Sequence, residues 1–331
     1  MNLSVVIPAY NERDNIIGTV EELLSVVGKI PDIDTVQIIV VDDHSSDNTF
    51  DVVSRMYDPR IACLRFSRRS GSHTALRAGI RETNGDAVLC ISADGQDDPR
   101  CLEEMLARWR NGDNIIWALR HDRNKESALI RLPAQIFYKT LFWLAGSGQR
   151  QVDLSRADFY LLDRTVVDAI NSCRERNTSL FGLIAWLGFK QGFVYYDRRQ
   201  RVSGSSKWNF RSRILLAKDW IVAFSGVPLR IASSVGILTA VSGICYAIFV
   251  VVNKLFFGNP VPGWTSLIVL VLILSGVQLT ILGIIGEYLW RNLDEARSRP
   301  LFFIEKRTGH KDDSVPFVME SGVAKKERSL S

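Results

Sequence analysis

The sequence predicts an α/β domain with a Rossmann-like, mostly parallel sheet, followed by an interfacial amphipathic helix and two transmembrane helices. The first prediction rests on residues 3–91, where short apolar runs alternate with segments of helical periodicity, as in parallel sheets with crossover helices. The second rests on two long segments after Val227 that carry no charge. Arginines and lysines flank these two segments on their outer sides, which is typical of juxtamembrane sequence.

The strands and helices of the first region follow from apolar runs, periodicity and capping residues. Residues 3–7 form a short apolar run that ends at Pro8, and residues 15–27 carry apolar side chains at helical spacing. Residues 46–49 supply helix-capping side chains ahead of the next apolar positions. Further strands are expected at 36–41, 61–66 and 87–91, and a further helix at 72–82.

The overall composition excludes several classes of protein. The chain has 331 residues, 47% of them hydrophobic and 23% charged, so it can bury a full core and is too apolar for a disordered protein. Its net charge of +5 is not arranged as a basic stripe interleaved with aromatic residues, which argues against a nucleic-acid partner. The five cysteines lack metal or C-x-x-C spacing, so neither zinc nor a disulfide framework is expected. The first residues predict a strand and not a signal peptide.

Two segments are expected to cross a membrane. Residues 231–252 and 264–285 each exceed the roughly 20 residues that the hydrocarbon core requires. Residues 211–229 mix apolar and charged side chains, as a helix lying in a membrane interface does. Because the loop between the spans holds only one charge, Lys254, the first domain and the C-terminal tail are expected on the cytoplasmic side of an inner or plasma membrane. A soluble core is the alternative for the two segments.

Polar side chains follow each predicted strand, at the edge where open parallel sheets bind ligands. Asp94 and Gln96 lie in the turn after the fourth strand and offer a carboxylate and an amide oxygen to Mg²⁺ or Mn²⁺. An ordinary loop is the alternative. Asp42 and Asp43 follow the second strand, where they can accept hydrogen bonds from a base or ribose, although Asp43 could instead cap the next helix.

Six motifs in a fixed order resemble one enzyme family. They are VVIPAYNE at 5–12, VVDDHSSDNT at 40–49, R-x-x-G-x-x-x-A-L-x-A-G at 68–79, SADGQDDP at 92–99, ADFYLLDR at 157–164 and RVSGSSKW at 201–208. As an ordered set they resemble the polyprenyl-phosphate glycosyltransferases, inverting family 2 enzymes of GT-A fold that include bactoprenol glucosyltransferases and dolichyl-phosphate mannose synthases. The resemblance covers residues 3–303, with the paired membrane helices and the G-E-Y-L-W-R sequence at 286–291.

The resemblance implies roles for the residues at matching positions. The implied nucleotide-sugar-binding residues are Pro8, Tyr10, Glu12, Asp42, Asp43, Arg68 and Asp94. Asp94 and Gln96 would hold the Mg²⁺ or Mn²⁺ that bridges the diphosphate. The implied catalytic residues are Asp158, as a base or positioning group, and Arg201, Ser206 and Lys207, near the phosphates of the donor and the lipid. Attraction to the membrane surface is the alternative for Arg201 and Lys207.

Three positions depart from the family pattern. Ser92 stands where the turn usually begins with Asp, Tyr160 where Arg is usual, and His44 where Gly is usual. The first two changes remove a carboxylate and a fixed cation, which would suit an altered donor sugar or a degraded enzyme. His73 is expected either on the surface at the start of a helix or in contact with the sugar.

The predicted reaction is transfer of one sugar from a nucleotide-sugar, UDP-linked more than GDP-linked, to undecaprenyl or another polyprenyl phosphate at the cytoplasmic membrane face. It would invert C1 and serve cell-envelope glycan or lipid modification. The expected parts are a catalytic domain (1–210), the interfacial helix (211–229), two transmembrane helices (230–290) and a cytoplasmic tail (291–331) disordered at its end. The resemblance also implies a homo-oligomer, a tetramer.

Two other functions compete with this prediction. A non-catalytic, membrane-bound scaffold that binds nucleotide-sugars is suggested by Ser92 and Tyr160. A processive polysaccharide synthase would share the nucleotide-binding half, but the chain lacks the Q-x-x-R-W motif and offers only two spans for a polymer channel.

Overall fold

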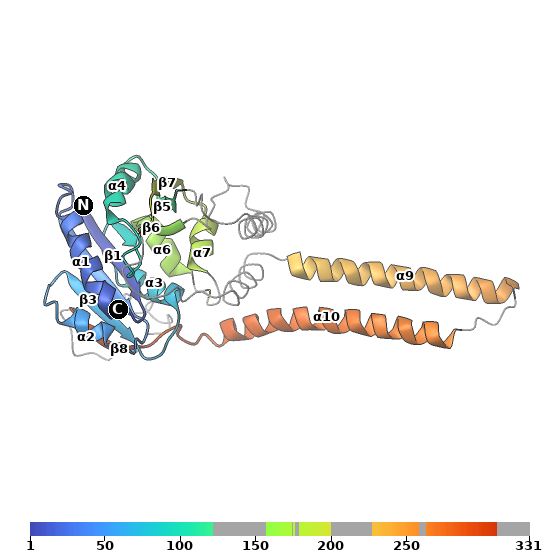
Figure 1. The fold of residues 1–331 in the computed structure, drawn as a ribbon. Coiled ribbons are helices and arrows are strands. Elements are labelled where there is room, and N and C mark those ends of the chain that lie inside the picture. The colour runs from blue at the N-terminus through green and yellow to red at the C-terminus, as the bar shows by residue number, and fades with distance from the viewer. Residues whose placement is uncertain (122–156, 174, 176–178, 200–226, 258–262, 310–331) are drawn as a thin grey trace, which may run out of the picture. The chain divides into compact units, whose positions relative to one another are not determined.

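The structure is a computed structural model that describes residues 1–121, 157–173, 175, 179–199, 227–257 and 263–309 (Figure 1). The described residues fall into two compact units. One comprises the residues up to 199 together with 300–309, and the other contains helices α9 (Val227–Phe257) and α10 (Trp264–Ala296). The interfacial helix predicted at 211–229 lies outside the described residues, apart from the first turn of α9.

The first unit is built on one sheet of eight described strands, in the order β7-β5-β6-β4-β1-β2-β3-β8. The strands are β1 (Asn2–Ala9), β2 (Thr35–Asp42), β3 (Ile61–Phe66), β4 (Ala87–Cys90), β5 (Ile115–Arg120), β6 (Ala157–Asp163), β7 (Gln191–Tyr196) and β8 (Ile304–Thr308). β1 is parallel to β2 and β4, β2 to β3, and β5 to β7. β6 and β8 are antiparallel to their neighbours. The predicted α/β fold with a mostly parallel sheet is therefore confirmed.

Helices cover both faces of this sheet. They are α1 (Arg13–Val27), α2 (Thr49–Ser54), α3 (Ser72–Arg81), α4 (Leu102–Arg110), which follows a 3₁₀ turn (Pro99–Cys101), α6 (Arg164–Ser172) and α7 (Leu180–Trp186). The apolar stripes of α1, α2 and α4 enter one core with the alternate side chains of β1 and β2, such as Val5 and Ile38. On the opposite face, Ala75 and Ala78 of α3 pack against Ile39 and Val41 of β2.

Helix α3 approaches the sheet closely because it carries glycine at position 79. A Cβ atom on Gly79 would lie 2.3 Å from Cγ1 of Val6 on β1, a distance that packed side chains do not adopt. Glycine therefore allows the helix that follows β3 to lie directly on the central strands. This contact fixes the position of the loop of residues 67–71, which leads into α3.

Strand β8 is an element that the sequence did not predict, since it lies in the segment expected to be a tail. It pairs with β3 and covers that edge of the sheet, with Cys63 opposite Thr308 and Phe66 opposite Ile304. Phe302 stacks on Phe66 at a ring-centroid distance of 4.9 Å. The chain after α10 thus returns to the α/β unit and becomes part of its sheet.

Helices α9 and α10 form the second unit and contact each other. Each contains a stretch long and apolar enough to cross a membrane, Ala232–Asn253 in α9 and Ile273–Ala296 in α10. Most of the described apolar side chains of these stretches are exposed or half-exposed, as the 67% exposure of Ile237 and the 70% exposure of Leu279 illustrate. Length, composition and exposure agree with the two predicted spans, which overlap both stretches.

Candidate active site

The sheet topology gathers the predicted site residues at one edge. β1, β2, β3, β4, β5 and β7 point the same way, while β6 and β8 run in the opposite direction. The first residues of β6 and β8 therefore lie beside the last residues of their neighbours. Asp158 near the start of β6 and Glu305 near the start of β8 thus join the loops that follow β1, β2, β3 and β4. Open α/β sheets bind their ligands at this edge.

The turn after β4 is held by hydrogen bonds among its own side chains. Ser92 Oγ lies 2.8 Å from Asp94 Oδ1 and 2.5 Å from Asp97 Oδ2. The Ser92 N–H also donates to Asp97, at 3.1 Å, and the Gln96 N–H donates to Asp94, at 3.3 Å. Asp94 and Asp97 are both buried. An aspartate at position 92 would set a third carboxylate against these two, whereas the Ser92 hydroxyl links them.

Asp158 lies between arginines from two other strands. Its Oδ2 is 2.8 Å from Nε of Arg120, the last residue of β5, and its Oδ1 is 3.8 Å from Arg198, just after β7. The Asp158 side chain is 12% exposed, so it can meet a ligand only through a narrow face. Fixed positive charge beside this carboxylate is suited to receiving a phosphate.

Tyr196, at the end of β7, connects Asp158 to the turn after β4. Its hydroxyl is 2.7 Å from Asp158 Oδ2 and 3.0 Å from Asp97 Oδ1. Burial and the two neighbouring carboxylates raise the pKa of Tyr196, so the hydroxyl keeps its proton and acts as a donor. Burial likewise raises the pKa of Asp97, although hydrogen bonds from Ser92 oppose the shift. A continuous line of close polar contacts therefore joins Asp94 to Asp158 through Ser92, Asp97 and Tyr196, in which each hydroxyl has one proton to share between two carboxylates.

Arg199 ties the segment after β7 to the same turn. Its guanidinium bonds both carboxylate oxygens of Glu22 at 2.8 Å and Asp98 at 2.7 Å. Its backbone N–H donates to the Gln96 carbonyl at 3.0 Å, and its own carbonyl accepts from Gln96 Nε2 at 3.4 Å. The side-chain amide of Gln96 is thus oriented through its nitrogen.

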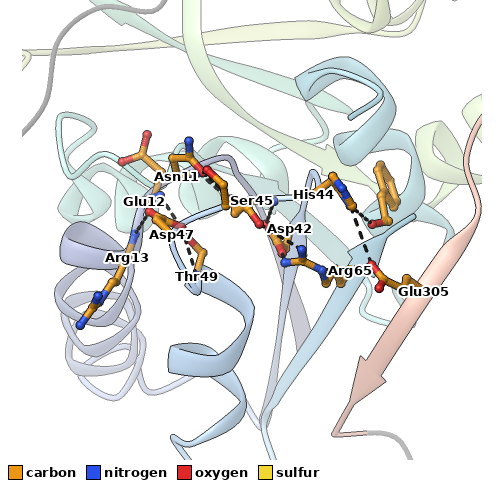
Figure 2. A network of polar contacts seen from close by, with 12 residues as sticks. Asn11, Glu12, Arg13, Asp42, His44, Ser45, Asp47, Thr49, Arg65 and Glu305 are labelled. Carbon is orange, nitrogen blue, oxygen red and sulfur yellow. Dashed lines mark hydrogen bonds and ion pairs between the residues drawn. The ribbon is translucent and has the colours of Figure 1, made fainter. Parts of the chain in front are cut away.

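Asp42 fixes the turn of residues 42–45 after β2 (Figure 2). Its Oδ1 accepts from the Ser45 N–H at 3.0 Å, and its Oδ2 accepts from Arg65 of β3 at 2.7 Å. The Asp42 side chain is completely buried, so its charge requires this arginine. Arg65 donates as well to the Ser45 carbonyl at 3.0 Å and to Glu305 of β8 at 3.1 Å. The predicted nucleotide-binding role of Asp42 stays a prediction, and its structural role is to shape this turn.

Asp43 holds the loop of residues 67–71 in the same way that Asp42 holds its own turn. Its two carboxylate oxygens accept from the N–H groups of Ser70 at 2.6 Å and Gly71 at 2.8 Å. Burial raises the pKa of Asp43, and these two N–H groups oppose the shift. Asp43 caps no helix in this arrangement, because Asn48 occupies the N-cap of α2. The aspartate pair therefore connects the ends of β2 and β3.

The predicted nucleotide contacts after β1 lie at the same edge. Pro8 is in β1, and Glu12 is the N-cap residue of α1, with its carboxylate 2.8 Å from the Asn15 amide. The Tyr10 ring is covered by the guanidinium of Arg69, 4.0 Å from the ring centroid. Arg68, the predicted arginine of this loop, is exposed.

Tyr160 and His44, two of the three departures from the family pattern, and the candidate sugar contact His73 have different physical settings. Tyr160 is fully buried, in contact with the rings of Trp117 and Phe181, so the residue that stands in place of the usual arginine packs in the core. His44 has φ of +60°, a left-handed conformation that costs a non-glycine residue about 1–2 kcal/mol, and its Nδ1 lies 3.0 Å from the Phe66 carbonyl. His73 packs edge-on against Phe181 at 5.7 Å, and burial lowers its pKa to about 4. His73 lies in the first turn of α3, as one alternative expected, but its side chain is half-buried in this aromatic cluster. Its contact with the sugar stays a prediction.

The predicted residues Arg201, Ser206 and Lys207 lie outside the described residues. Sequence reasoning missed several polar residues of the edge, namely Arg65, Arg69, Asp97, Arg120, Tyr196, Arg198, Arg199 and Glu305. Arg120 and Tyr196 end strands that the sequence did not predict, and Glu305 lies in the expected tail. For Asp97 the signal was present, since it follows Gln96 directly in the quoted motif.

Comparison with known proteins identifies the family. The model of Glycosyl transferase family 2 matches residues 4–174. The chain is 36% identical over 310 residues to "Uncharacterized glycosyltransferase YkcC" of Bacillus subtilis (strain 168), with 92% of this chain and 94% of that protein covered. It is 34% identical over 312 residues to the "Bactoprenol glucosyl transferase" of Shigella phage SfX, with 93% and 100% covered.

A solved structure shares the fold. Mannosyl-3-phosphoglycerate synthase from Rubrobacter xylanophilus superposes with a TM-score of 0.50 at 20% identity, covering 68% of this chain and 73% of that one. The fold and the family match together define a glycosyltransferase of GT-A fold. The chain belongs to glycosyltransferase family 2, and the resemblance inferred from its motifs is confirmed by relatives that align over nearly its whole length.

Proposed function

We propose that this glycosyltransferase moves a single sugar from a nucleotide-sugar, UDP-linked more than GDP-linked, to a polyprenyl phosphate such as undecaprenyl phosphate. The observation that carries the proposal is the meeting, at one sheet edge, of the acidic turn after β4 with Asp158 and its two arginines. The acceptor phosphate would attack C1 of the sugar as the C1–oxygen bond to the diphosphate breaks. The nucleoside diphosphate leaves with the electron pair, and C1 is inverted.

The donor atoms of the acidic turn suit a hard divalent cation. Asp94 would supply a carboxylate oxygen and Gln96 its amide oxygen, with the amide already oriented by Arg199. Mg²⁺ is commonly held by one or two carboxylates together with substrate phosphates, so a site with few protein ligands fits it. When bound, Mg²⁺ or Mn²⁺ would neutralise charge on the diphosphate.

Asp158 and the neighbouring arginines would act on the acceptor. A phosphate monoester has a second pKa near 6, so it is largely a dianion at pH 7 and needs little deprotonation before it attacks. The greater obstacle is repulsion between two polyanions. Arg120 and Arg198 would reduce this repulsion, and Asp158 would hold both guanidinium groups in place. Arg201, Ser206 and Lys207 are proposed to contribute in the same way.

A lipid acceptor agrees with the two apolar helices. The relative from phage SfX is named for bactoprenol, a polyprenyl lipid, and it aligns with this chain along its full length. Removing an isoprenoid from a bilayer costs about 0.8 kcal/mol per buried CH₂, so the enzyme has to work at the membrane. We place α9 and α10 across the membrane, with the α/β unit and the C-terminus on the cytoplasmic side, in a homo-oligomer.

The test is an assay of the purified full-length protein in detergent or nanodiscs. Undecaprenyl phosphate and Mg²⁺ are supplied with UDP-glucose, other UDP-sugars and GDP-mannose, and lipid products are analysed by mass spectrometry. The proposal predicts one hexose added to the lipid phosphate with at least one donor. Nucleotide binding without any lipid-linked product would instead favour a scaffold. Products with several sugars would favour a processive enzyme.

A further inference from the structure

We propose that Glu305, on the strand that follows the second apolar helix, is a positioning residue of the donor site. By holding Arg65, it fixes the turn of residues 42–45, to which the nucleotide binds. The segment after the membrane helices would thus complete the donor site. This inference rests on the proposed use of a nucleotide-sugar.

The Arg65 guanidinium joins three elements of the α/β unit. It bonds Asp42 at the end of β2, the Ser45 carbonyl in the turn, and Glu305 on β8, at 2.7, 3.0 and 3.1 Å (Figure 2). The arginine is only 17% exposed, and its partner Asp42 is completely buried. Each bond restricts a different direction of the planar guanidinium. Loss of any one of them therefore removes one of the three restraints on the orientation of the guanidinium.

Glu305 is itself held firmly by the strand that carries it. The Ser67 N–H donates to the Phe303 carbonyl at 2.9 Å, and Phe302 stacks on Phe66. The pairing register between β3 and β8 shifts between Arg65 and Phe66. Such irregularities in a ladder re-aim side chains, and here the irregularity adjoins the ion pair of Arg65 with Glu305.

The turn of residues 42–45, which Arg65 holds, is also hydrogen-bonded to the loop after β1. Ser45 Oγ accepts from the Asn11 N–H at 2.9 Å, and Asn11 Oδ1 accepts from the Ser46 N–H at 2.9 Å. Figure 2 shows this line of contacts running from Glu305 through Arg65 and Ser45 to Asn11. A displacement of Arg65 is therefore transmitted to both loops that are predicted to bind the nucleotide.

The ion pair of Arg65 with Glu305 joins the predicted donor site to a strand that closely follows the last apolar helix. Helix α10 ends at Ala296 and β8 begins at Ile304, so few residues separate the last apolar helix from Glu305. The donor site is thus assembled from segments at both ends of the chain. Removal of the residues after α10 would damage nucleotide binding as well as the sheet edge.

The experiment compares Glu305→Gln with Glu82→Gln in the full-length protein. Glu82 pairs at 2.8 Å with Arg307, which lies on β8 as Glu305 does. This second ion pair also fastens β8 to the α/β unit but does not include Arg65. Isothermal titration with UDP, and separately with GDP, gives the Kd at fixed Mg²⁺. Thermal unfolding of both variants reports any general loosening of β8.

The two variants are expected to differ in nucleotide affinity alone. Glu305→Gln should raise the Kd of UDP about two- to fivefold, the effect expected of a partly exposed charge pair, whereas Glu82→Gln should leave it unchanged. Simple electrostatics predicts the opposite sign for Glu305→Gln, because removing a negative charge should favour an anionic nucleotide.

Each other outcome overturns a specific claim. An unchanged or lowered Kd for Glu305→Gln, with normal binding by the wild-type protein, would refute the positioning role and leave the proposed function intact. Equal weakening by both variants would mean that β8 acts only as a structural strand. Failure of the wild-type protein to bind either UDP or GDP would reject the nucleotide-sugar reaction and this inference together.

Discussion

Two hydroxyl groups of the site each lie between two carboxylates. Ser92 stands between Asp94 and Asp97, and Tyr196 stands between Asp97 and Asp158. Hydrogen bonds to charged groups contribute about 1.5–3 kcal/mol, so these contacts help to fix the relative positions of the turn after β4 and Asp158. Ser92, which breaks the family pattern, is thereby given a structural purpose that motif comparison alone could not reveal.

Removing the Tyr196 hydroxyl should slow transfer without unfolding the protein. Tyr196→Phe keeps the buried ring but removes one of the contacts that orient the Asp158 carboxylate, so we expect kcat to fall about tenfold, equivalent to about 1.4 kcal/mol, with little change in donor KM. Tyr195→Phe is the matched control, because the adjacent side chain is 52% exposed. Equal kcat values for the two variants would contradict the role of the hydroxyl.

His73 should make stability depend on pH. Its pKa is lowered by burial from 6.5 to about 4, so between these values the unfolded chain binds a proton that the folded chain does not. The free energy of unfolding should therefore rise with pH across this window, by up to about 1.4 kcal/mol per pH unit, and level off above it. Thermal unfolding from pH 4.5 to 8 measures the slope. His73→Phe should reduce it, while replacement of the exposed His121 by Phe should not.

Among the structural elements, α3 depends most directly on a single small residue. Gly79→Ala would force a methyl group into Val6 of β1 and should destabilise the protein by about 1–3 kcal/mol. Gly18→Ala on α1 is the control, since its added methyl group meets open space and should stabilise the helix by about 0.5–1 kcal/mol. If the unfolding midpoints of both variants shift in the same direction, α3 does not lie as close to β1 as the structure shows.

The elements up to residue 91 were predictable because each strand is a short apolar run bounded by polar loops. The two long apolar helices were predictable from their composition as well, but the strands after residue 91 were not, for physical reasons. The first residues of β6 bear the polar site residue Asp158, and β8 has the sequence Ile-Glu-Lys-Arg-Thr, whose charges conceal a strand at the sheet edge. Charged edge strands are common because they discourage aggregation. Site residues at strand ends could be predicted where a sequence motif contains them. They could not be predicted where only the pairing of strands brings them to the edge of the sheet.

At the scale of the whole molecule, family membership makes the chain a glycosyltransferase, and its two long apolar helices have the length and composition to cross a membrane. The sheet edge supplies an acidic turn, an arginine-flanked carboxylate and a turn fixed from β8. Each of these parts comes from a different region of the chain. We propose that together they transfer a sugar to a lipid phosphate at this edge.

The most direct test is the rate of lipid-linked sugar formation by wild-type and Asp158→Asn protein, measured with saturating donor, undecaprenyl phosphate and Mg²⁺. The account predicts a product with the wild-type protein and a rate at least about 100-fold lower for the variant, with UDP binding retained. Asp168→Asn, at a 68% exposed position, is the control and should keep the wild-type rate. Turnover of Asp158→Asn at the wild-type rate would contradict the claim that this sheet edge is the active site.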